Sequence, residues 1–231
     1  MAITLEQRAE YIRSFASHVS HEFKTPLTAI QGGVEILRDH FDTMSTDERQ
    51  RFLGNVAQDA DRLTRLTQRL LELARADVLK PGENDVADVI AVAERLRERY
   101  KERGLAVSIA SKGEGAPVAM AEETLEAVLS HLLDNAHQHG ANGATVRVNS
   151  ELSAATLQPS LTITVSDDGP GISAANAKRI FEPFFTTARQ KGGTGMGLAI
   201  TRSLLAAHGG DIELDTSERG AEFKLRIPRV Q

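Results

Sequence analysis

The chain has 231 residues, of which 41% are hydrophobic and 26% are charged, a balance typical of a folded protein in water. Its 32 acidic residues outnumber its 27 Lys and Arg residues, and neither half is basic, which argues against general binding to nucleic acid or to anionic membranes. Without cysteine there is no disulfide, thiol nucleophile or cysteine-ligated zinc, which is compatible with a cytoplasmic location. No apolar run approaches the roughly 20 residues of a membrane span.

The first third of the chain is predicted to form a helical hairpin. Apolar residues recur every three or four positions in two runs, 12–41 and 52–73. The polar segment 42–46 separates the runs, and either Ser45 or Thr46 is suited to cap the second helix. Because a hairpin cannot bury both of its apolar faces, we expect a second copy of the chain to complete a four-helix bundle.

The rest of the chain mixes helices and strands after a break at 78–84 that contains Pro81 and Gly82. The predicted elements are helices over 85–102, 122–139 and 195–208, and strands over 106–110, 117–120, 145–149, 161–166, 212–214 and 222–227. We therefore divide the chain into a first domain over 1–78, a linker over 79–84 and a second domain over 85–231.

The first predicted helix carries a histidine on the side opposite to its apolar stripe. At about 100° per residue, His21 lies about 200° from Val19, so its imidazole should face solvent. Glu22 follows directly, and a carboxylate beside a neutral imidazole can orient it or accept its proton. Pro26 costs about 3 kcal/mol inside a helix, which a functional requirement would explain. His18, on the flank of the stripe, is the rival histidine, and we assign it a structural role.

The segment Ser20–Leu27 resembles the phosphoacceptor box of the two-component sensor histidine kinases, whose pattern is His-Glu-x-x-Thr-Pro-Leu. This resemblance implies that His21 accepts the γ-phosphoryl group of ATP and that Glu22 acts as the general base. It also implies that Thr25 serves in dephosphorylating the partner protein.

Three motifs in the second half predict a nucleotide site. Asp167 ends a predicted strand and can accept a hydrogen bond from an exocyclic amine, and Gly169 and Gly171 let backbone amides approach a ligand. The loop 192–198 opens a predicted helix, whose N-terminal amides can bind phosphate. Asn135, late on an amphipathic helix, offers an amide oxygen of the kind that suits Mg²⁺.

In this order the motifs resemble the N, G1, F and G2 boxes of the ATP-binding domain that histidine kinases share with gyrase, Hsp90 and mismatch-repair ATPases. The resemblance implies that Asn135 binds Mg²⁺, that Asp167 reads the adenine amino group, and that Phe181–Phe185 begins the nucleotide lid. It assigns further nucleotide contacts to Gly169, Gly171, Phe184, Gly193, Thr194, Gly195, Gly197 and Leu198.

The N box departs from the family pattern at two positions. His131 stands where many members have asparagine, and Gln138 stands where they have a cation. An imidazole is a poor Mg²⁺ ligand, but it can donate to a phosphate oxygen or to bound water. Lys191 or Arg189, in the lid, can supply the missing positive charge.

Taken together, the resemblance implies the cytoplasmic core of a sensor histidine kinase: a helical-hairpin dimerisation domain followed by an α/β-sandwich ATP-binding domain. We expect ATP- and Mg²⁺-dependent autophosphorylation of His21, then phosphoryl transfer to an aspartate of a response-regulator receiver domain. The expected state is a homodimer without a nucleic-acid partner, which meets a membrane only through a sensor region absent from this chain. Two alternatives stay open: mainly a phosphatase with weak kinase activity, or a dimeric scaffold that only binds nucleotide.

Overall fold

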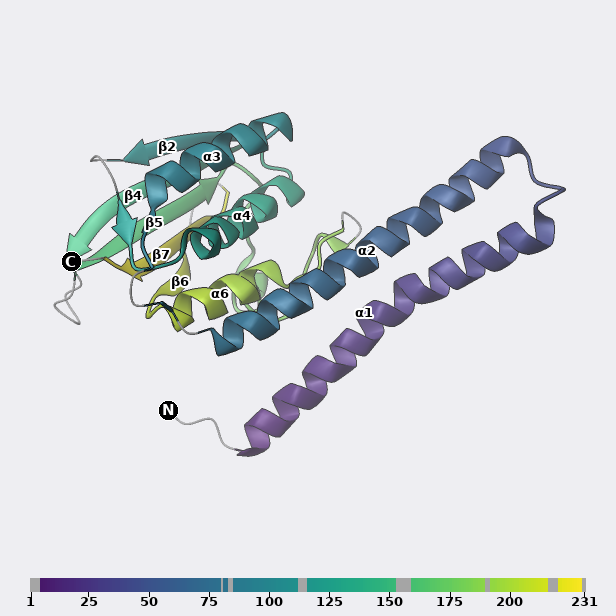
Figure 1. The fold of residues 1–231 in the computed structure, drawn as a ribbon, viewed down its shortest axis with the longest axis horizontal. Helices are drawn as coiled ribbons and strands as arrows, with labels where there is room; N and C mark the ends of the chain where they lie inside the picture. The colour runs from purple at the N-terminus through teal and green to yellow at the C-terminus, as the bar shows by residue number, and fades with distance from the viewer. Residues whose placement is uncertain are drawn as a thin grey trace. The chain divides into compact units, whose positions relative to one another are not determined.

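The computed structural model describes residues 5–79, 81–82, 85–111, 116–152, 159–189, 192–215 and 220–229. The chain divides into two compact units, residues 1–71 and residues 72–231 (Figure 1). None of the helices in these described segments has an apolar stretch long enough to cross a membrane.

The first unit is the predicted hairpin. Helix α1 (Leu5–His40) and helix α2 (Thr46–Val78) are joined by a short turn. Ser45, rather than Thr46, caps α2: the Glu48 N–H donates to Ser45 Oγ (3.3 Å), and the Ser45 N–H donates to the Glu48 carboxylate (2.9 Å). This reciprocal capping box accounts for the sharp start of α2. The same bonds hold the pKa of the Glu48 carboxyl below its usual value, the backbone bond from Ser45 being the main cause.

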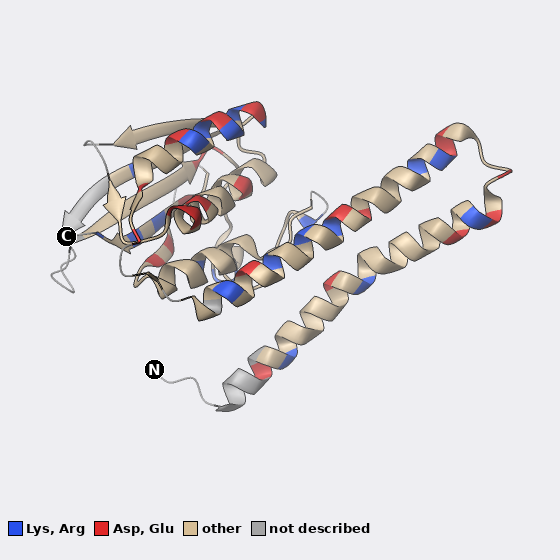
Figure 2. Ribbon diagram, viewed as in Figure 1, with Lys and Arg blue, Asp and Glu red and all other residues tan. Residues whose placement is uncertain are grey.

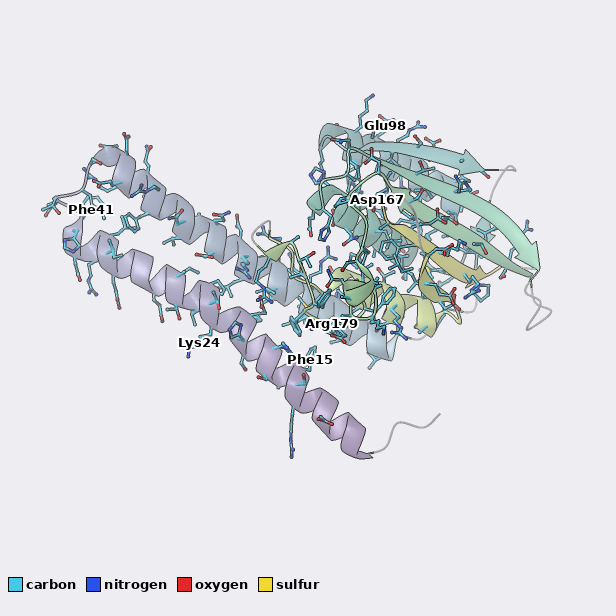
Figure 3. The ribbon with its side chains drawn as sticks, turned by 180° about the vertical axis from the view of Figure 1, so that it is seen from behind. Phe15, Lys24, Phe41, Glu98, Asp167 and Arg179 are labelled. Atoms are coloured by element: carbon cyan, nitrogen blue, oxygen red, sulfur yellow. The ribbon has the colours of Figure 1, made fainter. Side chains whose placement is uncertain are left out.

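The hairpin leaves much of its apolar surface exposed. Leu27 and Val34 on α1 are each about half exposed (49% and 50%), and Leu53 on α2 is 56% exposed. Phe41, the first residue of the turn after α1, is 50% exposed (Figure 3). One hairpin therefore does not cover its own apolar positions, as the sequence pattern predicts.

The second unit is built on a five-stranded sheet. Its strands, in spatial order, are β2 (Ala106–Ser111), β4 (Gly143–Leu152), β5 (Pro159–Asp167), β7 (Glu222–Pro228) and β6 (Asp211–Asp215). Strands β2 and β4 pair in parallel, and all other neighbours in this sheet are antiparallel. A separate short ribbon pairs β1 (Ala87–Asp88) with β3 (Pro117–Val118).

Three helices cover one face of this sheet, with α4 between the other two (Figure 1). They are α3 (Val89–Glu102), α4 (Glu122–Gln138) and α6 (Gly197–Ala207), and a single-turn helix, α5 (Ala174–Ala177), follows β5. On β7, Phe223, Leu225 and Ile227 are buried in the core, whereas Lys224 and Arg226 alternate with them. The predicted α/β sandwich behind a helical hairpin is therefore confirmed.

The structure corrects some predicted boundaries. The helix predicted to start at residue 85 starts at Val89, because the Asp88 side chain accepts the N–H groups of Ile90 and Ala91 and caps it. The strand predicted over 117–120 ends at Val118. Strands β4 and β5 extend beyond their predicted ranges, and β1 and α5 were not predicted.

Candidate active site

His21 projects from α1 into solvent. Its side chain is 74% exposed, and its Nδ1 lies 4.0 Å from Oε1 of Glu22. The exposure agrees with the helical-wheel argument. The Nε2 atom on the other side of the ring is therefore the one available to an incoming group.

Glu22, in contrast, is almost completely buried, and it is held by a residue from the second helix. Its side chain is 6% exposed, and Nη2 of Arg62 on α2 donates to Glu22 Oε2 over 3.2 Å. Arg62 is itself only 20% exposed. One carboxylate thus binds a guanidinium through one oxygen and presents the other to His21.

Thr25 and His18 make local contacts within α1. The exposed Thr25 hydroxyl donates to the carbonyl of His21 (3.2 Å), one turn earlier. The next residue, Pro26, has no N–H to donate and lies buried within the helix. His18 is exposed too, and its Nδ1 donates to the Ser14 carbonyl (2.8 Å). Of these two histidines, only His21 is directly followed by a carboxylate residue.

In the second unit, Asp167 is held at the end of β5 by two backbone donors. The N–H groups of Gly169 (2.9 Å) and Ala221 (3.1 Å) both donate to its Oδ1. Among the described residues its Oδ2 accepts no hydrogen bond, so this oxygen can accept one from a ligand amine. Figure 3 shows Asp167 within the second unit.

Gly220, which lies outside the motifs identified in the sequence, allows the backbone of Asp167 to approach the start of β7. Its φ is +77°, and a Cβ there would lie 1.7 Å from the backbone oxygen of Asp167. No other residue type fits this contact. Gly169 and Gly171 follow Asp167 in the same turn, and a Cβ on Gly171 would meet the carbonyl oxygen of Gly220 at 2.9 Å.

The F box and the second glycine loop are in contact. Phe184 is buried and has a φ of +68°, rare for a residue with a side chain. A Cβ on Gly195 would come within 2.5 Å of the Phe184 backbone. Gly193, Thr194 and Gly195 lie before α6, and Gly197 and Leu198 are its first two residues. The structure therefore brings the lid base and the predicted phosphate loop to the N-terminus of α6.

Helix α4 presents Asn135 with an unpaired side chain. Asn135 is half-buried, and its amide makes no hydrogen bond within the described part of the chain. The described residues include no group of three or more His, Cys, Asp or Glu that could hold a metal ion. A single amide oxygen fits Mg²⁺ only if phosphate and water supply the other ligands, which is the usual arrangement for this ion.

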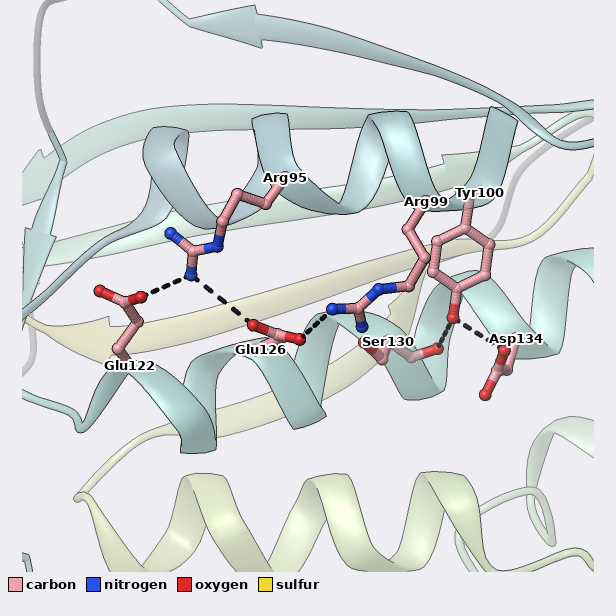
Figure 4. Close-up of polar contacts among 7 residues, drawn as sticks. All are labelled: Arg95, Arg99, Tyr100, Glu122, Glu126, Ser130 and Asp134. Atoms are coloured by element: carbon pink, nitrogen blue, oxygen red, sulfur yellow. Dashed lines mark hydrogen bonds and ion pairs between the residues drawn. The ribbon is translucent and has the colours of Figure 1, made fainter. Parts of the chain in front are cut away.

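Polar contacts with α3 fix the rotation of α4 (Figure 4). The buried Tyr100 hydroxyl shares its one proton between Oδ1 of Asp134 (2.7 Å) and the Ser130 carbonyl (3.0 Å). Burial and the Asp134 carboxylate raise the pKa of Tyr100 well above its usual value. Closer to the start of α4, Arg95 and Arg99 pair with Glu122 and Glu126. Charges of both signs alternate along this surface of α3 (Figure 2). Asp134, next to Asn135 in sequence, therefore joins α4 to α3.

The His131 side chain is enclosed by protein groups. It is 2% exposed; its Nε2 lies 3.4 Å from Glu72 Oε2 and its Nδ1 lies 3.2 Å from Thr201 Oγ1. Both ring nitrogens thus have protein partners in this structure. Gln138 is the last residue of α4, Arg189 is exposed, and Lys191 lies outside the described residues.

Two family models match the chain. Residues 11–78 match the His Kinase A (phospho-acceptor) domain, and residues 120–231 match the histidine kinase-, DNA gyrase B- and HSP90-like ATPase. The chain belongs to the histidine kinases. The two domains are the cytoplasmic core of a two-component histidine kinase, an enzyme class that phosphorylates its own histidine and passes the phosphoryl group on.

Curated relatives of this kinase core are sensor proteins. The probable sensor histidine kinase TcrY of Mycobacterium tuberculosis is 32% identical over 98% of this chain and 48% of its own length. The alginate biosynthesis sensor protein KinB of Pseudomonas aeruginosa is 30% identical over 96% of this chain and 38% of its own length. The kinase core thus spans less than half of either relative.

A similar solved structure is that of the histidine kinase ThkA in complex with the response regulator protein TrrA. It superposes with a TM-score of 0.69 at 22% identity, covering 97% of this chain and 64% of that one. At this identity the likeness shows a shared fold.

Proposed function

We propose that this kinase core transfers the γ-phosphoryl group of ATP to His21. The observation that carries the proposal is the exposed His21 imidazole with the Glu22 carboxylate 4.0 Å from its Nδ1. The family models of both domains support it, because a phosphoacceptor domain and an ATPase domain occur in one chain.

The proposed transfer uses the two ring nitrogens of His21 differently. Nε2 attacks the γ-phosphorus, the bond from that phosphorus to the bridging oxygen breaks, and ADP leaves with the electron pair. Glu22 accepts the Nδ1 proton as positive charge develops on the ring, which makes it the general base. Arg62 keeps the Glu22 carboxylate oriented toward Nδ1.

The second unit holds the nucleotide. We propose that Asp167 Oδ2 accepts from the adenine amine, while the first amides of α6 and the 193–195 loop donate to the phosphates. Asn135 holds Mg²⁺, which when bound neutralises charge on the phosphates. Gly169, Gly171 and Phe184 shape the rest of the pocket, together with Thr194, Gly197 and Leu198.

The proposed acceptor for the phosphoryl group is an aspartate of a response-regulator receiver domain. The ThkA–TrrA complex supports this partner class. Thr25 supports a second activity, dephosphorylation of that regulator, because its exposed side chain lies one turn from His21 and can help to place a water. A core that acts mainly as a phosphatase, or only as a nucleotide-binding scaffold, is the alternative.

We further propose that the kinase is a homodimer through residues 1–78 and that residues 79–84 link this domain to the ATP-binding domain. The exposed apolar side chains of the hairpin support dimerisation, and the phosphoacceptor model ends at residue 78. We place the core in the cytoplasm, as part of a longer sensor that reaches the membrane.

Incubation with γ-labelled ATP and Mg²⁺ tests the proposal. We expect acid-labile, base-stable label on the wild-type chain, no label on His21→Gln, and retained label on His18→Gln. Both variants should bind ATP as the wild type does. Label mapped to His18, or label persisting on His21→Gln, would refute the assignment. Loss of phosphate from a phosphorylated regulator with His21→Ala then isolates the phosphatase activity.

A further inference from the structure

The buried His131 connects residues from three helices, all within the second unit. It lies on α4, its Nδ1 is 3.2 Å from the hydroxyl of Thr201 on α6, and its Nε2 is 3.4 Å from the carboxylate of Glu72 at the end of α2. With a proton on Nε2 the ring donates to the Glu72 carboxylate, and its Nδ1 then accepts from the Thr201 hydroxyl. Thr201 is fully buried, which makes that hydrogen bond costly to lose.

His131 also lies close to the first turn of α6. A Cβ placed on Gly197, the first residue of α6, would lie 3.7 Å from Cβ of His131, an ordinary van der Waals distance. The side chain that faces Thr201 therefore also lies beside the end of α6 that follows the glycine loop.

Asn135 lies four residues after His131 on α4, so it shares one face of the helix with it. His131 thus fixes the spacing between the helix that carries the proposed metal ligand and the helix that opens the proposed phosphate site. The adenine contacts come from other elements, since Asp167 ends β5 and Ala221 precedes β7.

We propose that His131 is a positioning residue for the triphosphate, and that Glu72 orients its ring from the last turns of α2. Through its contact with Thr201, and its place beside Gly197, the ring keeps the start of α6, and with it the phosphate loop, in position relative to Asn135. This role rests on the proposed nucleotide site. It predicts that the Glu72–His131–Thr201 contacts affect binding of the phosphates and spare binding of the adenine.

Calorimetric titration of the full chain with two probes tests this. The probes are Mg²⁺ with a non-hydrolysable ATP analogue, and AMP, which offers adenine without β- and γ-phosphates. We expect Thr201→Val, of nearly equal volume, to weaken analogue binding about five- to twentyfold and AMP binding less than about twofold. Glu72→Ala should act in the same direction, and Glu72→Gln, which keeps an acceptor for the Nε2 proton, should restore affinity.

Two controls separate positioning from general effects. Arg75→Gln changes the charge of an exposed residue in the same turns of α2 and should leave both affinities unchanged. If Glu72→Gln binds the ATP analogue as weakly as Glu72→Ala does, the effect comes from the lost charge. The proposal that Glu72 orients the His131 ring is then wrong. The proposal is also overturned if the Thr201→Val and Glu72→Ala variants lose equal affinity for both probes, or lose affinity for neither. A wild-type chain that binds neither probe would instead overturn the proposed nucleotide site itself.

Discussion

Arg62 helps to hold Glu22 beside His21, since the carboxylate is buried and binds the guanidinium through one oxygen. We expect Glu22→Gln to slow phosphorylation of His21 about 100-fold, as for a lost general base. Arg62→Gln should slow it about tenfold, because the base remains but loses its orientation. Labelling rates under saturating ATP, beside calorimetric ATP affinities, measure both effects.

The Arg62 variants have an internal control. Arg62→Lys keeps a cation for Glu22 and should recover much of the rate, while ATP affinity stays constant throughout. A variant that combines Glu22→Gln with Arg62→Gln should phosphorylate His21 no more slowly than Glu22→Gln alone, because the two residues act as one unit. Additive losses, or an unchanged rate in Arg62→Gln, would show that Arg62 has no part in the transfer.

Asp167 carries the expected preference for adenine. In Asp167→Asn the amide oxygen can keep the Gly169 and Ala221 N–H bonds, and the amide NH₂ then faces the adenine amine, donor against donor. We expect ATP affinity to fall at least tenfold, and the ratio of GTP to ATP affinity to rise because guanine offers an acceptor there. Competition titrations with both nucleotides measure the ratio.

The neighbouring carboxylate is the matched control. Asp168 is exposed, and its Oδ1 accepts the N–H groups of Asn142 and Gly143. Asp168→Asn should therefore leave nucleotide preference unchanged. If both variants behave alike, the adenine is read elsewhere.

At the scale of elements, Tyr100 joins α3 to α4 and makes this contact sensitive to alkali. Its pKa is raised in the folded protein by burial and by Asp134. The folded state thus holds the phenol proton more tightly than the unfolded state, whose pKa is about 10. The resulting stability is complete below pH about 10 and is lost as the pH rises through the folded pKa.

Tyr100→Phe should change the stability both at neutral pH and at alkaline pH. At neutral pH we expect a loss of about 1–2 kcal/mol, from the missing hydrogen bonds to Asp134 and Ser130. Above pH about 10 the variant should lose less stability than the wild type as the pH rises. Urea unfolding at several pH values measures this difference. Parallel curves for wild type and Tyr100→Phe would contradict the assignment.

Helices and strands with a clear periodicity of apolar residues, or with a capping residue, were predictable from the sequence. Contacts between elements that are distant in the sequence were not. The patterns predicted α1, α2, α4 and α6, because each has an apolar stripe, and the alternating strands of the sheet. The partner of Glu22 is 40 residues away on α2, and His131 meets Thr201 70 residues later. Nothing local marks Arg62 or Thr201 as partners, and Gly220 is recognisable only from its approach to Asp167.

For the whole molecule, we expect light scattering to give twice the chain mass of 25.1 kDa at micromolar concentration. Leu27 and Val34, seven residues apart on one face of α1, are half exposed, so the double change to Glu should yield a folded monomer. Lys24→Glu, at an exposed position, is the control that should stay dimeric (Figure 3). A monomeric wild type would remove the basis for the four-helix bundle.

The parallel pairing of β2 with β4 has a consequence for how the second unit folds. The connection between these strands contains β3 and all of α4, so the edge strand can join only by closing a loop of about 30 residues around that helix. The antiparallel pairing of β5 with β7 is also non-local, because residues 168–221 separate these strands, whereas β4–β5 and β6–β7 join consecutive strands. Such non-local closures are slow relative to local pairing. Stopped-flow refolding should therefore show the ability to bind nucleotide returning with a slow kinetic phase, because the β5–β7 closure brings the Ala221 N–H to the Asp167 carboxylate.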